Sequence, residues 1–423
     1  MTDLVRRWGL ILVTLGLAGG GLLLPGAPVG SVPPPAEPEP DNYVVCPAAE
    51  AGGGFTTRLG LAGPADVRLT AIGAVSGPRD LAVEFGTAQI AVEDLAELGV
   101  TPILVEGTVT AATYTRAGEA AGLAGCAPAS PEVVAVGGLA TSGGQGSTLV
   151  LANPFAAEAS IRLEAASEFG PDTPADLEEV RVPPFTVVEL VLDQLLAGRE
   201  SLSFSIVTER GLIAAGMRRT APNDLAVAEA VPARTQWFLG LPDFGFTGEA
   251  HIRSLAAVDT AYRVDAVSPE GLVEGVAEGV VGPQGQVVLA VDQLTEAGTG
   301  LVIASAEPIV VTLVHSSEDA IAVTPGADRE AARWVVPVSA VPAEGQTAMW
   351  ILNTAGSPLA AVVEPIGSGR SQHLELAPAA TTGAIVPNPD GAAILVEAAG
   401  PVVVFYGVLT GSAIAMSVAV PLE

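Results

Sequence analysis

The sequence predicts an all-β protein, built from tandem immunoglobulin-like β-sandwich units that follow one N-terminal membrane anchor or signal helix. Three observations predict this fold class. Short β-branched runs alternate with Gly and Pro, which number 49 and 34 among 423 residues. A phrase of strands and turns recurs four times along the chain. A single apolar run stands near the N-terminus, directly behind two arginines.

The first 30 residues predict a signal or anchor helix. Arg6 and Arg7 precede an apolar run from Trp8 to Leu24, and such a pair orients the N-terminus to the cytoplasm. The run is short for a membrane span and long for a signal-peptide core. Because no clear cleavage site follows, an uncleaved anchor is favoured over a cleaved signal, and a buried core helix is the other alternative. Residues 31–41, SVPPPAEPEPD, predict a stiff acidic linker.

The rest of the chain divides into four predicted sandwich units of about 95 residues each. They span residues 42–130, 131–233, 234–329 and 330–423. Each ends in an apolar strand, a turn at Gly or Pro, a second strand, a polar tip and a third strand. Equivalent residues near the start of these third strands recur about 93 to 102 residues apart, and they are Leu123, Leu225, Ile321 and Ile414.

The C-terminal stretch from Pro401 to Glu423 has two interpretations. It carries no charge before its last residue, so it could be a second membrane-spanning helix. It is also the fourth copy of the recurring phrase, and the equivalent tip in the third copy, His315–Ala320, carries charges that a span holds only at high cost. The β-branched run Val402–Val404 favours a strand as well. The sequence therefore predicts a β-hairpin here.

The two cysteines, Cys46 and Cys126, predict one disulfide if the chain is exported. Two free buried thiols are the alternative. A bridge closing a loop of about 80 residues would stabilise the fold by roughly 4 kcal/mol in the chain-entropy model. The bridge would also remove the only candidates for a cysteine nucleophile.

An aspartate recurs in the phrases VEDL, LDQL and VDQL, at Asp94, Asp193 and Asp292. Repetition favours a structural role, because an active site normally occurs once per chain. The expected role is to cap a short helical turn at the edge of each sandwich.

Three tryptophans, Trp237, Trp334 and Trp350, are candidates for stacking on a sugar ligand. Trp237 and Trp334 open their units at the same position, and Trp350 lies in the middle of a predicted strand. Such places favour a role in the core over a role in ligand binding.

Few patterns indicate catalysis or a bound cofactor. The histidines His251, His315 and His373 share no spacing and are predicted to lie on the surface. No nucleophile-elbow motif occurs, although a pair of carboxylates in a glycan hydrolase stays an alternative. The segments Ser142–Ser147 and Asn388–Gly391 favour ordinary turns over ion-binding loops. The sequence therefore predicts no cofactor and no metal.

The formal charge is −29 and the chain contains no lysine. A surface this acidic repels phosphate backbones, so nucleic acid is not an expected partner.

The segment at Arg6 and Arg7, the pair Cys46 and Cys126, and the phrase LVLANP at Leu149–Pro154, followed by an alternating strand, resemble the actinobacterial family known as domain of unknown function 5719. The resemblance implies an exported, membrane-anchored protein of the cell envelope with no assigned activity. It implies no catalytic residues.

The expected function is that of a non-catalytic envelope scaffold or adaptor, because tandem sandwiches more often serve as spacers and binding surfaces than as enzymes. Its expected partners are the membrane, through the N-terminal helix, and an envelope protein or cell-wall polymer. One alternative is a carbohydrate- or polymer-binding protein, and another is an envelope glycan hydrolase. The expected location is extracytoplasmic, or secreted if the helix is cleaved.

Overall fold

The computed structural model of the chain divides into two compact units, Met1–Glu37 and Pro38–Glu423. It describes residues 42–422 except 48–49, 52–53, 55, 64–65, 74–78, 83–85, 92–98, 101, 119, 131, 242–246, 269, 296–298, 318–319, 338–345, 369, 387–391 and 411–412. The predicted helix and linker of residues 1–41 lie outside the described residues. Within the described ranges, no helix is both long and apolar enough to cross a membrane.

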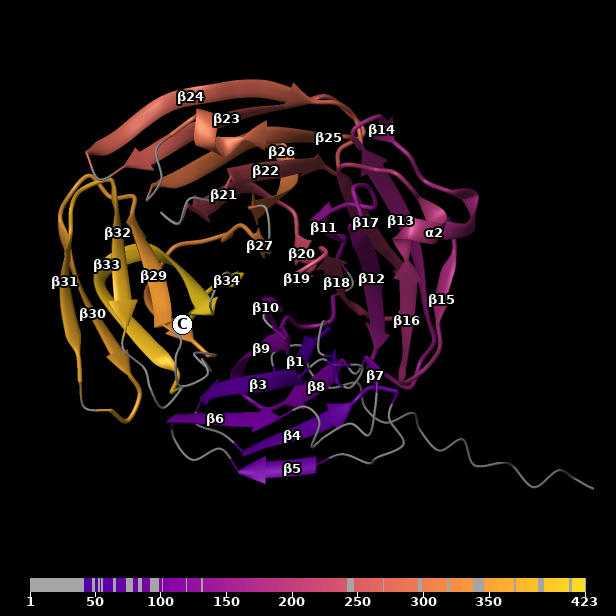
Figure 1. Cartoon of the computed structure of the whole chain (residues 1–423), viewed down its shortest axis with the longest axis horizontal. Helices are drawn as coiled ribbons and strands as arrows, with labels where there is room; N and C mark the ends of the chain where they lie inside the picture. Colours follow the sequence, from indigo (N-terminus) through magenta and orange to yellow (C-terminus); the bar gives the residue numbers. More distant parts are fainter. Residues whose placement is uncertain are drawn as a thin grey trace, which may run out of the picture. The chain divides into compact units, whose positions relative to one another are not determined.

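The described residues confirm the predicted all-β class (Figure 1). The first strand group, residues 43–125, contains a four-stranded sheet in the order β1 (Tyr43–Cys46), β8 (Ile103–Glu106), β4 (Asp66–Ala71) and β5 (Arg79–Ala82). Its second sheet has the order β10 (Ala120–Gly125), β9 (Thr110–Ala117), β3 (Thr56–Gly63) and β6 (Gly86–Ala91). A small sheet pairs β2 (Glu50–Ala51) with β7 (Gly99–Val100).

The second strand group, residues 134–232, repeats this arrangement. One sheet has the order β14 (Gly170–Pro171), β13 (Ala159–Ser167), β17 (Leu202–Arg210), β11 (Val134–Leu139) and β20 (Val231–Pro232), and β15 (Val180–Val182) also pairs with β13. The other has the order β16 (Thr186–Val191), β12 (Gly146–Asn153), β18 (Ala214–Thr220) and β19 (Leu225–Glu229). Two short helical segments are η3 (Ala175–Leu177) and α2 (Leu192–Leu195).

In the third strand group, residues 234–325, one long strand, β26 (Gly300–Ser316), takes part in both halves of the sheet. Its first half pairs with β21 (Arg234–Gly240) and β23 (Thr260–Ser268), and its second half pairs with β22 (Thr247–Ser254) and β27 (Ile321–Pro325). The outer strands are β24 (Gly271–Val281) on β23 and β25 (Gln286–Ala290) on β22, and η4 (Val291–Gln293) follows.

The fourth strand group, residues 331–421, is built in the same way around β33 (Ile394–Thr410). Its first half pairs with β28 (Ala331–Val336) and β30 (Leu359–Pro365), and its second half pairs with β29 (Gln346–Asn353) and β34 (Ala413–Val418). The outer strands are β31 (Gln372–Leu376), β32 (Ala380–Val386) and β35 (Val420–Pro421). The C-terminal stretch from Pro401 is thus strand and not helix.

One detail of the recurring phrase was predicted wrongly. The sequence predicts a turn at Pro308 and at Gly400–Pro401, but β26 and β33 run straight through these positions. Both prolines are exposed, and the register with the opening strand shifts beside each of them. A proline is tolerated at such a shift because its missing N–H removes no ladder hydrogen bond.

One strand of each group, namely β10, β19, β27 and β34, lies in the middle of the unit Pro38–Glu423 (Figure 1). β10 contacts β19 and β34, and β27 contacts the same two strands. The four strands therefore form a closed cycle of contacts, in which every group touches two others. The predicted domain boundaries at 130, 233 and 329 stay a prediction, since the groups pack as one compact unit.

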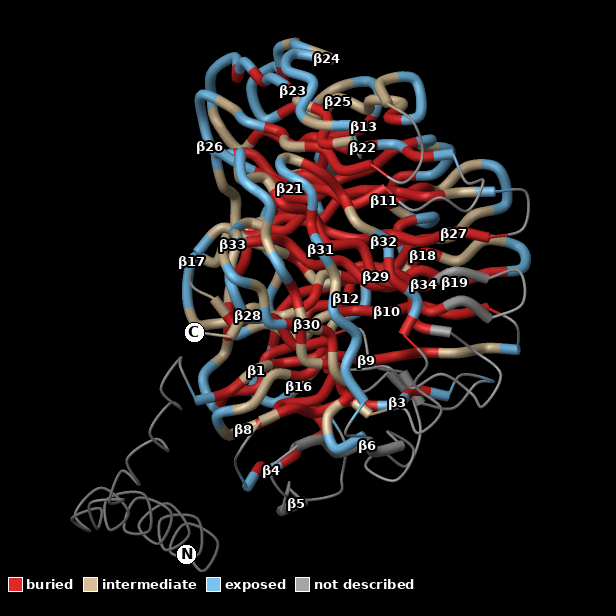
Figure 2. Tube along the Cα trace, turned by 90° about the vertical axis from the view of Figure 1, so that its left-hand side faces the viewer, coloured by how far each residue is buried: buried red, intermediate tan, exposed pale blue. Residues whose placement is uncertain are grey.

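Buried residues run through the interior of the unit Pro38–Glu423 (Figure 2), and clusters of them combine residues of different groups. The core of the second group includes Val314 and Val323 of the third. The core of the fourth group includes Tyr114 and Leu123 of the first, and Phe238 of the third. Exposed residues concentrate on outer strands such as β24. Burial of apolar surface between groups therefore adds to the burial within each group.

A buried asparagine explains the phrase LVLANP. Asn153 Nδ2 donates to the carbonyl oxygens of Ala157, at 2.7 Å, and Val182, at 3.0 Å, while its Oδ1 accepts the N–H of Phe155 at 3.0 Å. Asn353 makes the equivalent bonds in the fourth group. The side chain fixes the turn between two strands by satisfying backbone groups that the turn leaves unpaired.

Candidate functional site

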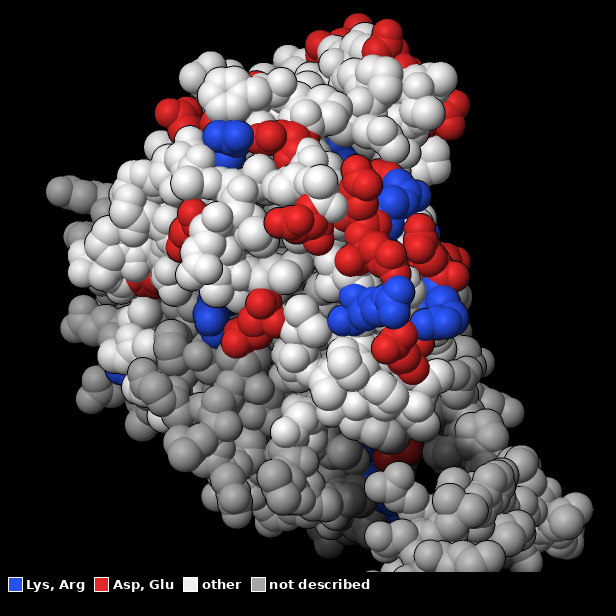
Figure 3. All heavy atoms as spheres, turned by 90° about the vertical axis from the view of Figure 1, so that its right-hand side faces the viewer, with Lys and Arg blue, Asp and Glu red and all other residues white. Residues whose placement is uncertain are grey.

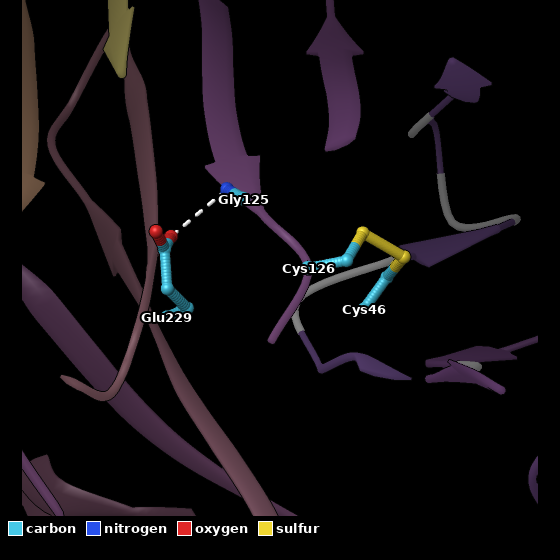
Figure 4. Close-up of a disulfide and its surroundings, with 4 residues drawn as sticks. All are labelled: Cys46, Gly125, Cys126 and Glu229. Carbon is cyan, nitrogen blue, oxygen red and sulfur yellow. Dashed lines mark hydrogen bonds between the residues drawn. A yellow bond between two sulfur atoms is a disulfide. The ribbon is translucent and has the colours of Figure 1, made fainter. Parts of the chain in front are cut away.

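The predicted disulfide between Cys46 and Cys126 is present (Figure 4). It joins β1 to the residue after β10, beside a pair of backbone hydrogen bonds between Val45 and Ala127. The preceding residue, Gly125, donates its N–H to Glu229 Oε2 of the second group at 2.9 Å. The bridge thus lies next to a contact between strand groups.

The three candidate tryptophans are buried. Trp237 and Trp334 are 1% exposed, and Trp350 is 5% exposed. Trp237 Nε1 donates to the carbonyl oxygen of Ile309 at 2.8 Å, and Trp334 Nε1 donates to that of Val402 at 3.0 Å. These indoles have no open face for a sugar, so the structure favours their alternative role in the core.

The prediction of surface histidines is wrong for two of the three. His251 is 2% exposed and His315 is 3% exposed, whereas His373 lies on the surface. Both buried side chains lie on paired strands, β22 and β26, where one face packs against the second group and the other faces the interior of the third. The strand pattern could not reveal this, because both faces of the pair are covered.

Acid should therefore destabilise the protein through His315. Burial lowers the pKa of His315 to about 4, well below the usual 6.5. Between these values the unfolded chain binds a proton that the folded chain does not, so stability falls as the pH drops from 6.5 to 4, by about 3 kcal/mol. Burial lowers the pKa of His251 too, against the opposing effect of Glu249.

Chemical denaturation between pH 4 and 7 measures this loss. His315→Met, which cannot titrate, should reduce the dependence on pH, to which His251 still contributes, and His373→Met is the matched substitution at the surface. Equal slopes for His315→Met and the parent protein would show that another group is responsible.

The capping role predicted for the recurring aspartates is wrong for Asp193 and Asp292. Asp193 lies in the first turn of α2 and Asp292 in that of η4, but neither segment has a side-chain cap. Asp193 Oδ1 instead accepts the N–H of Ser147, at 3.3 Å, from β12. A cap accepts hydrogen bonds from the free N–H groups of a helix's first turn. Segments of three or four residues are too short to form such a turn in full. Asp94 lies outside the described residues.

The glycine-rich segment Ser142–Ser147 is a turn, as predicted. Gln145 donates its N–H to the carbonyl oxygen of Ser142 at 3.0 Å, and Gly143 and Gly144 have positive φ. The side chain of Gln145 accepts from Arg219, so the turn is held against β18. The other segment, Asn388–Gly391, lies outside the described residues. Where the chain is described, no group of three acidic, histidine or cysteine side chains is arranged to hold a metal ion.

Asp224 is the functional candidate that the sequence did not single out. Its Oδ1 accepts the N–H of Ala121 at 3.1 Å and of Leu225 at 2.8 Å, and its Oδ2 accepts the N–H of Ile321 at 2.7 Å. These donors belong to the first, second and third groups. Asp224 is 4% exposed, and burial raises its pKa even though the three N–H donors oppose this. One carboxylate therefore fastens three groups together at the centre.

A second buried carboxylate, Glu229, lies at the other end of β19. Burial raises the pKa of Glu229, against the hydrogen bonds from backbone N–H groups. Burial also raises the pKa of the Tyr406 phenol, and the negative charge of Glu229 adds to this effect. Asp224, directly before β19, and Glu229, at its end, thus both make contacts between groups.

The second and third groups meet through a polar interface. Arg253 donates from Nε to Ser205 Oγ at 3.1 Å and from Nη2 to the carbonyl oxygen of Glu164 at 3.3 Å. Gln286 Nε2 donates to Ser201 Oγ at 3.0 Å. Burial lowers the pKa of Arg253 to about 10. Because buried polar groups need partners in fixed positions, this interface sets one orientation of the two groups.

Gly138 of the second group leaves room for the side chains of Val314 and Val323 of the third group. Its φ is +75°, and a Cβ added there would lie 2.8 Å from Val314 Cγ2 and 2.9 Å from Val323 Cγ1. Gly138→Ala should therefore lower the free energy of unfolding by about 2–4 kcal/mol, through backbone strain and overpacking together.

Gly144→Ala is the matched control for that substitution. Gly144 has φ +80° but nothing within 4 Å of its added Cβ, so only the backbone strain of about 1 kcal/mol applies. Thermal unfolding of both variants separates the two contributions. Equal losses of stability in the two variants would mean that Val314 and Val323 move aside without a measurable loss of packing energy.

A surface groove opens beside the same interface, with a volume of about 340 Å³. Its apolar lining consists of Val133, Ala233, Leu255, Ala256 and Pro308. Two carboxylates, Glu132 and Glu307, also line it, and both are exposed. The groove is thus an apolar depression with acidic side chains at its edge, which suits binding more than chemistry.

Comparison with family models matches residues 102–387 to DUF5719, a family of unknown function. The chain belongs to this family. The resemblance seen in the sequence is therefore confirmed at the level of the family. None of the curated proteins matches the chain. In this DUF5719 protein the matched residues include the whole second and third groups, and with them Asp224, the polar interface and the groove.

Proposed function

We propose that this DUF5719 protein is a non-catalytic, extracytoplasmic scaffold or adaptor of an actinobacterial cell envelope. In this proposal its strand groups are immunoglobulin-like units, and the N-terminal helix holds it in the membrane. The disulfide supports an exported protein, since disulfides persist in oxidising compartments.

The observation that carries the proposal is the cycle of contacts fastened by Asp224. Three groups share one buried carboxylate, and the second and third also share a polar interface. Such connections hold the outer surfaces of the groups in fixed relative positions, as a scaffold needs. The buried ionisable side chains Asp224, Glu229 and Arg253 are all used in these contacts.

The surface supports a protein partner more than a polyanion. On one face, Arg and acidic side chains lie side by side (Figure 3). Exposed ion pairs among the described residues include Arg181–Glu179 at 2.8 Å and Arg210–Glu158 at 2.8 Å. Exposed pairs of this kind add only about 0.2–1 kcal/mol to stability, so their main effect is to present both charges to a partner. The charge of −29 still disfavours nucleic acid.

The two alternatives have less support. Burial of the three tryptophans removes the candidate platform for a carbohydrate. For a glycan hydrolase, the two carboxylates that line the groove, Glu132 and Glu307, are both exposed. A general acid in such enzymes is held in apolar surroundings that raise its pKa.

The test of the proposed function uses the full chain, immobilised in mild detergent. It is mixed separately with purified cell-wall polymer and with detergent-solubilised envelope proteins at physiological salt. We expect retention of a specific envelope protein and no retention of polymer. Retention of polymer alone, or release of reducing sugar ends from it, would contradict the scaffold or adaptor function.

A further inference from the structure

The groove beside the second and third groups has a filled counterpart elsewhere in the chain. At the junction of the first and second groups, the rings of Tyr43 and Phe155 pack edge to face, with centroids 5.6 Å apart. Both side chains are buried there, in a cluster with Ala129 and Leu212. An open groove and a packed aromatic pair thus occur at two junctions of the same kind.

Backbone hydrogen bonds establish which residues are equivalent. The carbonyl oxygens of Phe155 and Ala256 each accept the N–H of a residue with positive φ, namely Phe185 at 3.2 Å and Gln284 at 2.8 Å. Phe155 and Ala256 therefore occupy the same place in successive groups.

Strand pairing identifies the second equivalent pair. Val45 pairs with Ala127 in the first group, and Ala135 pairs with Val231 in the second. Two residues earlier on each opening strand stand Tyr43 and Val133. The groove is thus the space that two aromatic rings fill at the other junction, left open because Val133 and Ala256 are small.

The edge of the groove is negative and uncompensated. Neither Glu132 nor Glu307 takes part in an ion pair among the described residues. The neighbouring guanidinium of Arg234 is engaged by Asp328, with Nε 3.2 Å from Oδ2, and it also donates to the carbonyl oxygen of Ala233. A ligand that fills the apolar space would therefore gain from a positive charge at its edge.

We propose that this groove binds one aromatic or large aliphatic side chain of a partner protein, next to an arginine or lysine in the partner's sequence. The inference deepens the proposed adaptor function and rests on it. The lining offers no aromatic face to a sugar, and its aliphatic side chains complement an apolar side chain better. The two glutamates then select a basic neighbour.

The binding experiment uses three short peptides and ligand-observed NMR with the full chain in detergent. The probes are N-acetyl-Arg-Trp-Arg-amide, its Glu-Trp-Glu analogue and its Arg-Ala-Arg analogue. We expect saturable binding of the first, with Kd on the order of 1 mM, because only one side chain is buried. The analogue with two glutamates and the analogue without the indole should each bind at least about tenfold more weakly.

Two sets of variants locate this binding in the groove. Ala256→Phe places a ring where Phe155 lies at the other junction, so it should weaken binding of the Arg-Trp-Arg peptide at least about tenfold. Glu132→Gln with Glu307→Gln should weaken it about fivefold and reduce its dependence on salt. The matched control is Glu270→Gln with Glu375→Gln, which removes two charges from exposed positions elsewhere. All four glutamates are exposed, so their variants still test binding in the groove if the ring introduced by Ala256→Phe disturbs folding.

Four outcomes would overturn the groove proposal. Ala256→Phe could bind the Arg-Trp-Arg peptide as tightly as the parent protein does, or the parent protein could bind the Glu-Trp-Glu peptide as tightly as the Arg-Trp-Arg peptide. The parent protein could fail to bind the Arg-Trp-Arg peptide up to about 10 mM, or Ala256→Phe could change the oligomeric state. The last would show that a second copy of the chain fills the groove. If groove variants still retain the envelope protein bound by the parent, the adaptor function stands and the groove is not its site. If the peptide binds the groove but no envelope protein is retained, the adaptor function falls instead.

Discussion

Asp224→Ala should lower the free energy of unfolding by about 4 kcal/mol, because three buried N–H groups would lose their acceptor. The donors are Ala121, Leu225 and Ile321, at 2.7 to 3.1 Å from the carboxylate oxygens. Water does not easily replace the lost acceptor, because the Asp224 side chain is only 4% exposed. Because the donors belong to three strand groups, the loss should also loosen the contacts between groups.

The substitution Asp224→Asn separates the hydrogen bonds from the charge. Asparagine keeps one acceptor oxygen, which can still serve Ala121 and Leu225, but it turns a donor toward Ile321. Burial raises the pKa of Asp224, so the charged form is itself disfavoured in the fold. The folded state thus holds the carboxyl proton more tightly than the unfolded chain does. This contribution to stability falls as the pH rises from 3.8 through the folded pKa. We therefore expect Asn to cost less than Ala, about 1–3 kcal/mol.

Chemical denaturation at neutral pH measures both variants. Asp259→Asn, at an exposed position, is the control and should change stability by less than about 0.5 kcal/mol. Amide hydrogen exchange gives an independent reading, because Ala121 and Ile321 should lose protection in Asp224→Ala. A loss below about 1 kcal/mol with unchanged exchange would mean that Asp224 does not fasten the groups.

The sequence was sufficient for those features that depend on local pattern. Alternating and β-branched runs predict the strands, and recurrence shows that Pro401–Glu423 belongs to a hairpin rather than to a membrane span. Two cysteines, in a chain that the sequence predicts to be exported, predict the bridge between Cys46 and Cys126. Each of these predictions depends only on the pattern of neighbouring residues, on its recurrence along the chain, or on the number of cysteines.

The features that depend on packing between groups could not be predicted in this way. In the sequence, Asp224 is one of many polar residues that precede a strand. Its role follows from the N–H groups of Ala121 and Ile321, which only the folded chain places within hydrogen-bond distance. His251 and His315 are predicted at the surface because a strand pair usually has one face in contact with solvent, but both side chains are buried, because another strand group packs on that face. The sequence contains one indication of the groove, because Phe155 and Ala256 differ in size at equivalent positions of the repeat. That difference could not be interpreted without the structure, which places both residues at junctions between groups.

Loss of the disulfide should lower the free energy of unfolding by roughly 4 kcal/mol in the chain-entropy model, because the bridge closes a loop with a sequence separation of 80. The variant is Cys46→Ala with Cys126→Ala, so that no free thiol remains. Both cysteines pack against the core of the first strand group, with Cys46 completely buried. Alanine therefore also leaves a small cavity, which adds about 1 kcal/mol to the loss.

The position of the bridge predicts where the protein loosens first. Gly125, next to Cys126, donates to Glu229 of the second group (Figure 4). Without the bridge, the end of β10 is held by its strand pairs and the contact with Glu229 but has lost its covalent tie to β1, so the amide of Gly125 should exchange faster while that of Ile321 changes little. Treating the parent protein with a reductant should reproduce the effect, and the same treatment should not change the double variant. A double variant as stable as the parent protein, with Gly125 equally protected, would show that strand pairing and the contact with Glu229 hold this junction without the bridge.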